Sequence, residues 1–501
     1  MIVAAPDWIV LMASVMGLGA LLVGGEGLRL LGVSTAVTRR LVHAGVCLFV
    51  AVTPWLFSGP GPVMGLSAAF VVVNGWSRGR GWWPGIHAER PASWGTVAVP
   101  LAVIPAATVT WAVAADRVLS FQVAFLVLGV ADPLAAAVGE RWGGYRLTAT
   151  ATGAGTATMA VVTAGLVGAG MGMAGWGSGR ILVAMLVTGV VAGAVEAIGA
   201  HGWDNLFVVI AVVTVLVFLS DAAVWGRRGV AGVGIGAVVA AGATAVEALT
   251  RRGAVGAGLF AASLVSLGGL PWAVPGFAFF VLSSALSFLP GKRAAEAGDA
   301  PRRTLRQVLA NGGVAWVLLL GAGLAPPEMA VLRATAFAGF LGALAAAAAD
   351  TWATEVGTRY AGRPWSLRSG TRVPQGTSGA VSVGGTVGAA LGAGSVVGAA
   401  LLVMPGPAPA LLSMGVAAGL VGMAVDSLVG ATVQARYRGP EGGERETPGE
   451  TGEPPSRGWR WVDNDVVNAF GTLAGAAAGM GVYLLVYGAP GGCIGTAALF
   501  S

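Results

Sequence analysis

Long apolar stretches recur along almost the whole chain, separated by short polar links. Residues 118–139, 181–199 and 206–223 are typical, because each is apolar on every side and long enough to cross about 30 Å of hydrocarbon as a helix. A membrane β-barrel would instead alternate apolar and polar residues over short segments. The pattern predicts an all-α, polytopic helical membrane protein with about 14–16 transmembrane helices.

Composition agrees with this reading. The chain has 501 residues, of which 55% are hydrophobic and only 10% are charged, whereas soluble domains carry roughly 25% charged residues. Many of the 82 glycines lie inside the apolar stretches, where small residues let membrane helices approach closely. A GC-rich genome would enrich glycine and alanine as well, so composition alone does not separate the two causes.

The formal net charge is +6, but most basic residues fall in short links that can be placed on one side of a membrane, and Arg227 and Arg228 are the exceptions. By the positive-inside rule that side is the cytoplasm. We therefore expect a multi-pass protein of the cytoplasmic membrane, with the bilayer and not a nucleic acid as its partner. Residues 439–460 are rich in Gly, Pro and Glu and predict a flexible cytoplasmic loop.

An internal repeat divides the chain. Residues 131–141 (ADPLAAAVGER) resemble residues 349–359 (ADTWATEVGTR). In each copy a glycine follows the aspartate by seven positions, which puts both on one helical face. We expect two distantly related halves, 1–225 and 226–501.

Acidic residues inside membrane spans are costly and are functional candidates by default. Asp132 and Asp350 could instead cap a helix or pair with an arginine, but they recur in the same surroundings, which favours function. Further polar residues gather at predicted cytoplasmic helix ends. These are Glu196, His201, Asp204 and Asn205; Asp426, Ser427, Thr432 and Gln434; and Asp463, Asn464, Asp465 and Asn468.

Carboxylate, amide and hydroxyl oxygens suit Mg²⁺ bound together with substrate phosphates. Arginines in the adjoining links supply donors for phosphate oxygens. Neither a GxxxxGK[ST] loop nor a kinase glycine loop with its catalytic segment occurs in the sequence. The residues therefore indicate phosphoryl transfer at a membrane site, with any nucleotide bound between helices and links.

The first half resembles the phytol kinase and dolichol kinase family over residues 39–208. The resemblance rests on residues 39–43 (RRLVH), 93–96 (SWGT), 132–143 (DPLAAAVGERWG), 196–197 (EA) and 202–206 (GWDNL). It implies phosphorylation of an isoprenoid alcohol, typically with CTP. The family's Lys-Ser/Thr-x-Glu-Gly-Ser element has no counterpart at residues 150–156 (TATGAGT), so the lysine and the glutamate are missing.

The second half resembles, from about residue 232 onward, the membrane family that contains plant phytyl-phosphate kinase and an uncharacterised vertebrate transmembrane protein. The matching segments are 307–313 (QVLANGG), 349–357 (ADTWATEVG), 372–382 (RVPQGTSGAVS), 426–432 (DSLVGAT) and 463–468 (DNDVVN). This resemblance implies that the second half adds phosphate to an isoprenyl monophosphate. One half would then make the substrate of the other, which suggests transfer of the lipid between adjoining sites.

Residue chemistry and the two resemblances together give the candidate site. The expected catalytic residues are Asp350, Glu355, Asp426 and Asp132. The expected metal ligands are Asp350, Asp426, Asn464 and Asp132. The expected nucleotide- or phosphate-binding residues are Arg359, Arg368, Arg372, Gly376, Thr377, Ser378, Asn311, Asp204, Asn205 and His43. The implied cofactors are Mg²⁺ and CTP or ATP as phosphate donor.

The expected function is a membrane isoprenoid kinase in isoprenoid salvage, with phytol or geranylgeraniol as examples of the parent alcohol. Two alternatives stay open. A secondary transporter also uses repeated halves and acids within the membrane, but its polar residues should lie near the midplane. In the other alternative the first half binds an isoprenoid without chemistry, as its missing lysine and glutamate suggest.

Overall fold

The computed structural model describes residues 6–80, 93–113, 117–148, 151–220, 228–288, 302–360, 362–375, 377, 379–404, 408–439, 444–449 and 452–487. Over these residues the chain forms 16 continuous helices and two pairs of two-residue strands. In this described part of the chain, eleven helices are long and apolar enough to span a bilayer, and three shorter apolar helices accompany them. The prediction of an all-α, multi-pass membrane protein is confirmed.

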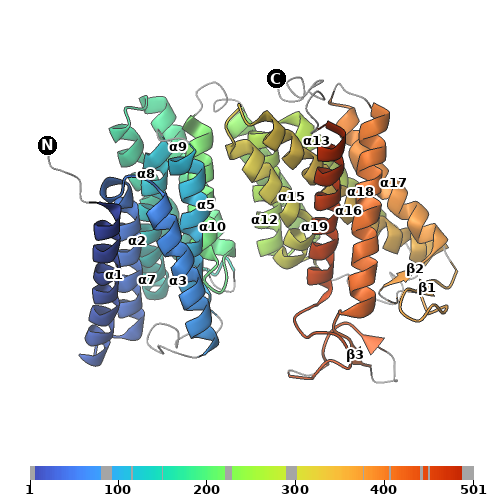
Figure 1. The fold of residues 1–501 in the computed structure, drawn as a ribbon, viewed down its shortest axis with the longest axis horizontal. Helices are drawn as coiled ribbons and strands as arrows, with labels where there is room; N and C mark the ends of the chain where they lie inside the picture. The colour runs from blue at the N-terminus through green and yellow to red at the C-terminus, as the bar shows by residue number, and fades with distance from the viewer. Residues whose placement is uncertain are drawn as a thin grey trace. The chain divides into compact units, whose positions relative to one another are not determined.

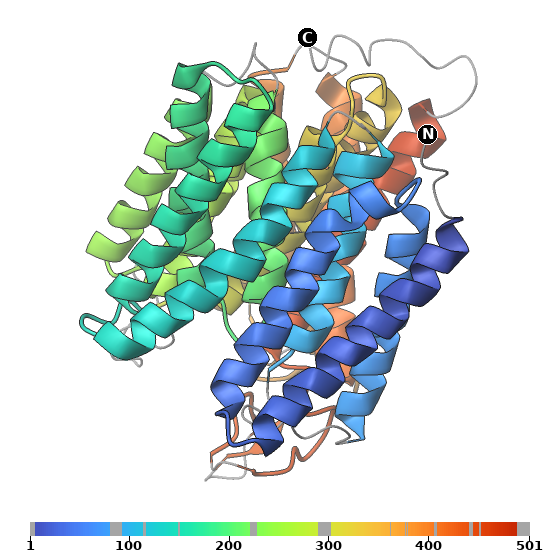
Figure 2. The same cartoon turned by 90° about the vertical axis from the view of Figure 1, so that its left-hand side faces the viewer.

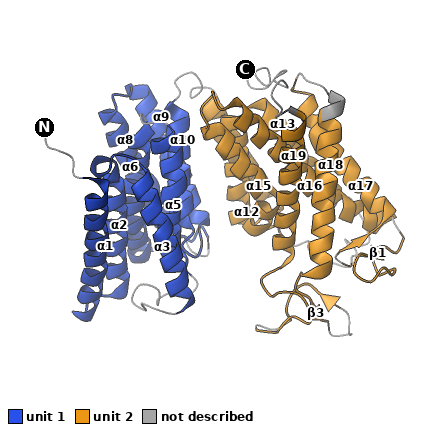
Figure 3. Ribbon diagram, in the orientation of Figure 1, with its two compact units in different colours: residues 1–226 blue, residues 227–501 orange. Residues whose placement is uncertain are grey.

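Contacts between Cα atoms divide the chain into two compact units, residues 1–226 and 227–501 (Figure 3). In unit 1 the helices run roughly parallel or antiparallel to one another (Figures 1 and 2). They are α1 (Asp7–Leu30), α2 (Thr35–Leu56), α3 (Gly61–Gly79), α5 (Gly95–Ala107) with the π-type turn η1 (Thr108–Ala112), α6 (Val118–Leu126), the π-type turn η3 (Val127–Ala131), α7 (Asp132–Trp142), α8 (Gly153–Met173), α9 (Ser178–Ile198) and α10 (Asp204–Ser220).

Unit 2 is a second helical bundle. Its elements are α11 (Val230–Ala245), α12 (Arg251–Ser263) with the π-type turn η5 (Leu264–Gly268), α13 (Leu270–Phe288), α15 (Leu305–Leu324), α16 (Ala330–Tyr360), β1 (Trp365–Ser366), β2 (Ala380–Val381), α17 (Val383–Leu401), α18 (Ala408–Thr432), β3 (Tyr437–Arg438), β4 (Glu444–Arg445) and α19 (Asn464–Tyr487). Strands β1 and β2 pair antiparallel, as do β3 and β4.

Helix α16 is the centre of unit 2. It has 31 residues, and its middle is buried on all sides because α15, α17, α18 and α19 pack around it. Glycines on the neighbouring helices make this possible: a Cβ on Gly475 of α19 would lie 2.5 Å from the Gly342 carbonyl oxygen, and one on Gly392 of α17 would lie 2.7 Å from the Ala348 oxygen. Close contact between small residues therefore replaces bulky side chains in this core.

In unit 1 the span that carries Asp132 is not a regular α-helix. The π-type turn η3 joins α6 to α7 directly before Asp132. A π-type turn holds one extra residue and frees a backbone carbonyl for an outside donor. Gly129 within this turn faces α2, where a Cβ would lie 2.8 Å from Cys47 Cβ. The turn therefore brings α2 close to Asp132.

Residues 439–460 were expected to form a flexible loop. In the part that the structure describes, the segment between α18 and α19 is ordered. Strands β3 and β4 form a short hairpin. Bridges Gln434↔Trp459 and Arg436↔Arg457 join its base to the returning chain, and three Arg–Glu ion pairs hold its side chains. Ion pairs and backbone bridges order this segment, and its low apolar content did not predict them.

Candidate functional site

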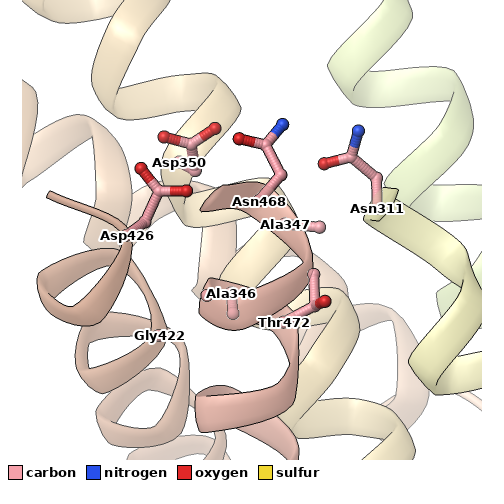
Figure 4. A pocket seen from close by; sticks show the side chains of 9 residues that line it. Asn311, Ala346, Ala347, Asp350, Gly422, Asp426, Asn468 and Thr472 are labelled. Carbon is pink, nitrogen blue, oxygen red and sulfur yellow. The ribbon is translucent and has the colours of Figure 1, made fainter. Parts of the chain in front are cut away.

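Four helices of unit 2 bring polar side chains into one small pocket (Figure 4). Asp350 comes from α16, Asp426 from α18, Asn468 and Thr472 from α19, and Asn311 from α15. The other lining residues are Ala346, Ala347, Gly422 and Gly471. The cavity volume is about 10 Å³, which suffices for a single water molecule or a bare metal ion. The acids of two helices thus face one space.

Hydrogen bonds orient the amides of the pocket. With its amide nitrogen facing α18, Asn468 donates to Asp426 Oδ2 over 3.3 Å and to the Asn464 carbonyl over 3.1 Å. Asn311 Nδ2 donates to the Gln307 carbonyl over 2.9 Å. Because each amide nitrogen is engaged, the amide oxygens are the groups left to serve as acceptors or metal ligands.

Glycines and alanines between the acids let their helices touch. A Cβ on Gly471 would lie 3.1 Å from Asp426 Cβ and 3.2 Å from the Gly422 carbonyl oxygen. Asp350 and Asp426 are consequently close enough for their charges to repel each other. Two carboxylates held together in an apolar bundle need a cation or protons to stabilise them.

The pocket lies toward the end of the bundle where the long links between helices emerge. Asp426 is six residues before the end of α18, or about 9 Å along the axis, and Asn468 is four residues into α19, or about 6 Å. Asp350 is ten residues before the end of α16, or about 15 Å. A solute from the aqueous side therefore meets these groups before it reaches the middle of the bundle.

The donor set fits Mg²⁺ held jointly with a substrate. Among the described residues, no three His, Cys, Asp or Glu side chains lie close enough to bind a metal by themselves. Mg²⁺ commonly uses one or two carboxylates and takes its other ligands from water and phosphate oxygens. Asp350, Asp426 and the Asn468 amide oxygen are the groups that would hold it.

Glu355 and Arg359 lie apart from this pocket. The Arg359 guanidinium is 3.3 Å from the Glu355 carboxylate one turn away, and it donates to the Leu286 carbonyl over 3.0 Å. Burial lowers the pKa of the Arg303 guanidinium, and the nearby Glu355 carboxylate opposes this. These residues form a separate charged cluster at the end of α16.

The link between α16 and α17 holds the other expected phosphate ligands. The Arg372 guanidinium lies 5.3 Å from the centre of the Trp365 ring, Arg368 is exposed, and Thr377 Oγ1 donates to the Pro374 carbonyl. Gly376 and Ser378 lie outside the described residues. Ser382 caps α17 by accepting from the Gly385 N–H over 3.0 Å. This backbone N–H is therefore already engaged and not open to a phosphate.

The asparagine of α19 that lines the pocket is Asn468, whereas the sequence analysis named Asn464 as the expected metal ligand. Asn464 begins α19 and is exposed. Asn468 lies one turn further along the same helix and faces the acids. The spacing of four was visible in the sequence, but the choice between the two depends on how α19 is rotated against α18.

In unit 1 the expected residues also come together. His43 Nε2 lies 3.1 Å from the Leu128 carbonyl oxygen, which belongs to the π-type turn, and 3.5 Å from Asp132 Oδ2. Thr156 donates to Glu196 over 3.1 Å. Asp132, Glu196 and Asp204 are close enough to repel one another. The acids are therefore more numerous than in the pocket of unit 2.

The segment that begins α10 is tied to the start of α5. The Trp94 N–H donates to the His201 carbonyl over 2.5 Å, and Asn205 Nδ2 is 3.5 Å from the Gly95 carbonyl oxygen. A Cβ on Gly202, whose φ is +83°, would overlap the backbone of Gly95. Asn205 thus helps to hold the start of α10 against the start of α5. Asp204 lies near Asp132 and Glu196 instead.

The two units repeat one local arrangement. Gly139 packs against Gly155, and Gly357 packs against Gly385, with Cβ-to-Cα approaches of 3.5 and 3.4 Å. Thr152 and Ser382 cap the helices that carry these partner glycines. Glu196 follows Thr152 by 196 − 152 = 44 residues, and Asp426 follows Ser382 by 426 − 382 = 44 residues. Glu196 is therefore the counterpart of Asp426, and it was not among the expected site residues.

Comparison with known proteins agrees with the membrane class. Residues 234–476 match the family model "Integral membrane protein DUF92". An uncharacterized membrane protein of Synechocystis sp. is 28% identical over 232 residues, which cover 43% of this chain and 78% of that protein. An uncharacterized membrane protein of Methanocaldococcus jannaschii is 29% identical over 193 residues, which cover 38% of this chain and 76% of that protein. No solved structure matches the chain.

Proposed function

We propose that unit 2 is a membrane phosphotransferase that moves the terminal phosphoryl group of a nucleoside triphosphate, CTP or ATP, onto a lipid phosphate such as an isoprenyl monophosphate. The observation that carries the proposal is the convergence of Asp350, Asp426, Asn468 and Asn311 in one pocket. The isoprenoid substrate comes from the resemblance to phytyl-phosphate kinase, and unit 1 would act on the parent alcohol.

The reaction requires little covalent work from the protein. An oxygen of the lipid phosphate attacks the γ-phosphorus, the bond to the β-phosphate oxygen breaks, and a nucleoside diphosphate leaves. The acceptor needs no base, because the second pKa of a phosphate monoester is about 6. Bound Mg²⁺ would offset charge on the transferred group. Asp350 and Asp426 would hold the metal, while Asn468 keeps the Asp426 carboxylate in place.

The depth of the pocket supports an enzyme over a secondary transporter. A transporter site is expected near the bilayer midplane, where both sides can reach it. Asp426 and Asn468 instead lie about 6–9 Å from the ends of their helices, while Asp350 lies deeper, about 15 Å from the end of α16. A water-soluble nucleotide and a lipid phosphate can both reach groups at that depth.

The test uses the full-length protein in nanodiscs with labelled CTP or ATP, Mg²⁺ and either phytyl monophosphate or geranylgeranyl monophosphate. Wild type should form the lipid diphosphate. Asp350→Asn and Asp426→Asn should each lower the rate about 100-fold or more, as loss of a charge-stabilising group does at other active sites. Product is measured by thin-layer chromatography of the labelled lipid.

The matched control is Glu328→Gln, an exposed acid in the link before α16 and far along that helix from Asp350. It should keep the wild-type rate. Absence of diphosphate from every lipid and nucleotide pair in correctly folded wild type would refute phosphoryl transfer. Uptake of a labelled anion into proteoliposomes would then decide for the transporter.

A further inference from the structure

Arg436 is the most deeply buried cation of the segment between α18 and α19. Its side chain is 6% exposed, whereas the side chains of Arg445 and Arg457 in the same segment are 33% and 20% exposed. A guanidinium is always charged and brings five N–H donors. Burying it is costly unless acceptors meet all of its donors.

The partners of Arg436 do not meet that need. Nη1 donates to Glu446 Oε1 over 3.0 Å, and Nη2 donates to Gln434 Oε1 over 3.1 Å. Nε is buried and has no hydrogen-bond partner among the residues that the structure describes. The Glu446 carboxylate and the Gln434 amide oxygen thus accept from the two terminal nitrogens of Arg436. These nitrogens could instead donate two parallel hydrogen bonds to one oxyanion.

The backbone at Arg436 is fixed in place. Its N–H donates to the Arg457 carbonyl over 3.0 Å, and its carbonyl accepts from both the N–H and the hydroxyl of Ser456, over 2.6 and 2.9 Å. One residue earlier, the Ala435 N–H donates to the Val462 carbonyl over 2.8 Å. The arginine is therefore preorganised, and little entropy is lost when it binds a ligand.

This arginine lies in the link that joins two helices of the unit 2 pocket, α18 and α19. It follows the end of α18, which carries Asp426, by four residues, and its backbone partners lead into α19, which carries Asn468. The Glu446 carboxylate is close enough to Asp426 for the two charges to repel each other. Repulsion by Asp426 thus opposes the attraction of Arg436 for the Glu446 carboxylate.

We propose that Arg436 binds a phosphate oxyanion of the substrate, and that the Glu446 carboxylate occupies this position when no phosphate is bound. The oxyanion would accept from Nη1 in place of the Glu446 carboxylate, while Nη2 keeps its bond to Gln434. This rests on the proposed function for the choice of substrate. The phosphate belongs either to the nucleotide or to the lipid, since both present the same oxygens.

The test measures binding without turnover by the full-length protein in nanodiscs. The probes are labelled β,γ-methylene CTP or ATP with Mg²⁺, geranylgeranyl monophosphate and inorganic phosphate. Glu446→Gln removes the competing carboxylate and should tighten binding about 10-fold, while Arg436→Gln should weaken it about 10-fold or more. The probe whose affinity changes identifies the source of the phosphate.

Matched controls lie in the same segment. Glu453→Gln and Glu444→Gln break the pairs with Arg445 and Arg457 and should leave every affinity unchanged. Glu446 is 44% exposed, so its glutamine variant should fold even if Arg436→Gln does not. If the Arg436–Glu446 ion pair were purely structural, Glu446→Gln would loosen the segment and weaken binding of the probes instead of tightening it.

The outcomes separate the two proposals. Tighter binding in Glu446→Gln without any lipid product in wild type would uphold the phosphate site and refute the phosphotransferase. Equal or weaker binding of all three probes in Glu446→Gln would overturn the role of Arg436. Lipid diphosphate formed at the wild-type rate and KM by Arg436→Gln would overturn it as well.

Discussion

Asn468 is the residue that most directly links packing to chemistry in unit 2. Its amide donates to Asp426 and to the backbone of its own helix, so it fixes the orientation of a carboxylate that would hold Mg²⁺. Loss of a partner of this kind typically lowers metal affinity or activity about 10–100-fold. Asn464, one turn earlier, is exposed and has no such contact with Asp426 in the described part of the chain.

Replacing each asparagine by leucine distinguishes the two. Asn468→Leu should lower kcat/KM for lipid diphosphate formation about 10–100-fold, because Asp426 loses its donor. Asn464→Leu should stay within about twofold of wild type, since surface changes away from such contacts have small effects. Both rates are measured with labelled nucleotide and geranylgeranyl monophosphate. The reverse order of effects would return the metal ligand to Asn464.

At this scale the sequence pointed to Asp350, Asp426 and Asn311, which line the pocket, but did not name Asn468 as a site residue. Asp350 and Asp426 stood out because a carboxylate in an apolar span is costly. Glu196 lay in a recognised polar cluster, but its role depends on where α9 meets α7 and α8. Arg436 looked like one more basic residue in a link, and its burial depends on a hairpin that sequence periodicity does not reveal.

Among the helices, α19 shows how glycine sets the geometry of the pocket. Gly471 and Gly475 face α18 and α16, while Gly481, further along, has open space where a Cβ would be. The first two positions determine how closely α19 approaches Asp426 and Asp350. The same residue type thus has a packing role at one position and none at another.

The change Gly475→Ala tests this difference. Its Cβ would lie 2.5 Å from the Gly342 carbonyl oxygen and 2.6 Å from Ala346 Cβ, so α19 must shift. We expect a loss of about 1–3 kcal/mol in the free energy of unfolding, as for other overpacked cores. Thermal unfolding in detergent, followed by tryptophan fluorescence, gives the change.

Gly481→Ala is the control in the same helix. Its Cβ would meet no atom of the described residues within 4 Å, so the change should be neutral or stabilising by up to about 1 kcal/mol, because alanine favours helix. Equal destabilisation by both variants would mean that the approach of α19 to α16 does not limit stability.

Helices were the elements that the sequence predicted best. Residues 118–139 and 181–199 correspond to helical spans Val118–Trp142 and Ser178–Ile198, because an apolar run of that length has few other folds in a bilayer. The π-type turn before Asp132 and the β3–β4 hairpin were not predicted. The first depends on packing against α2, and the second on ion pairs between residues 8 to 13 positions apart.

The whole chain consists of two units that share one arrangement and differ in its chemistry. Unit 2 combines two carboxylates with two amides, while unit 1 gathers Asp132, Glu196 and Asp204 beside His43. The repeat around Asp132 and Asp350 revealed the duplication in the sequence. It did not reveal which acid of unit 1 corresponds to Asp426, because that match needs the contacts of α8 and α9.

Two sites in one chain predict that a lipid monophosphate made by unit 1 is used by unit 2 before it leaves. With geranylgeraniol as substrate, wild type should release diphosphate with little free monophosphate. A mixture of Asp132→Asn and Asp350→Asn proteins in separate nanodiscs keeps one working site of each kind, but the intermediate must cross between particles. Diphosphate should then form at least about 10-fold more slowly, because the local concentration that linkage provides is lost.

The control for this comparison is each variant alone with the substrate of its intact unit. Asp132→Asn should convert the monophosphate at the wild-type rate, and Asp350→Asn should convert the alcohol at the wild-type rate, which shows that neither change damages the other site. Added unlabelled monophosphate should hardly dilute label passing from alcohol to diphosphate in wild type. If it dilutes the label fully, or if the mixture matches wild type, the intermediate exchanges freely and the fusion of the two units serves another purpose, such as joint insertion into the membrane.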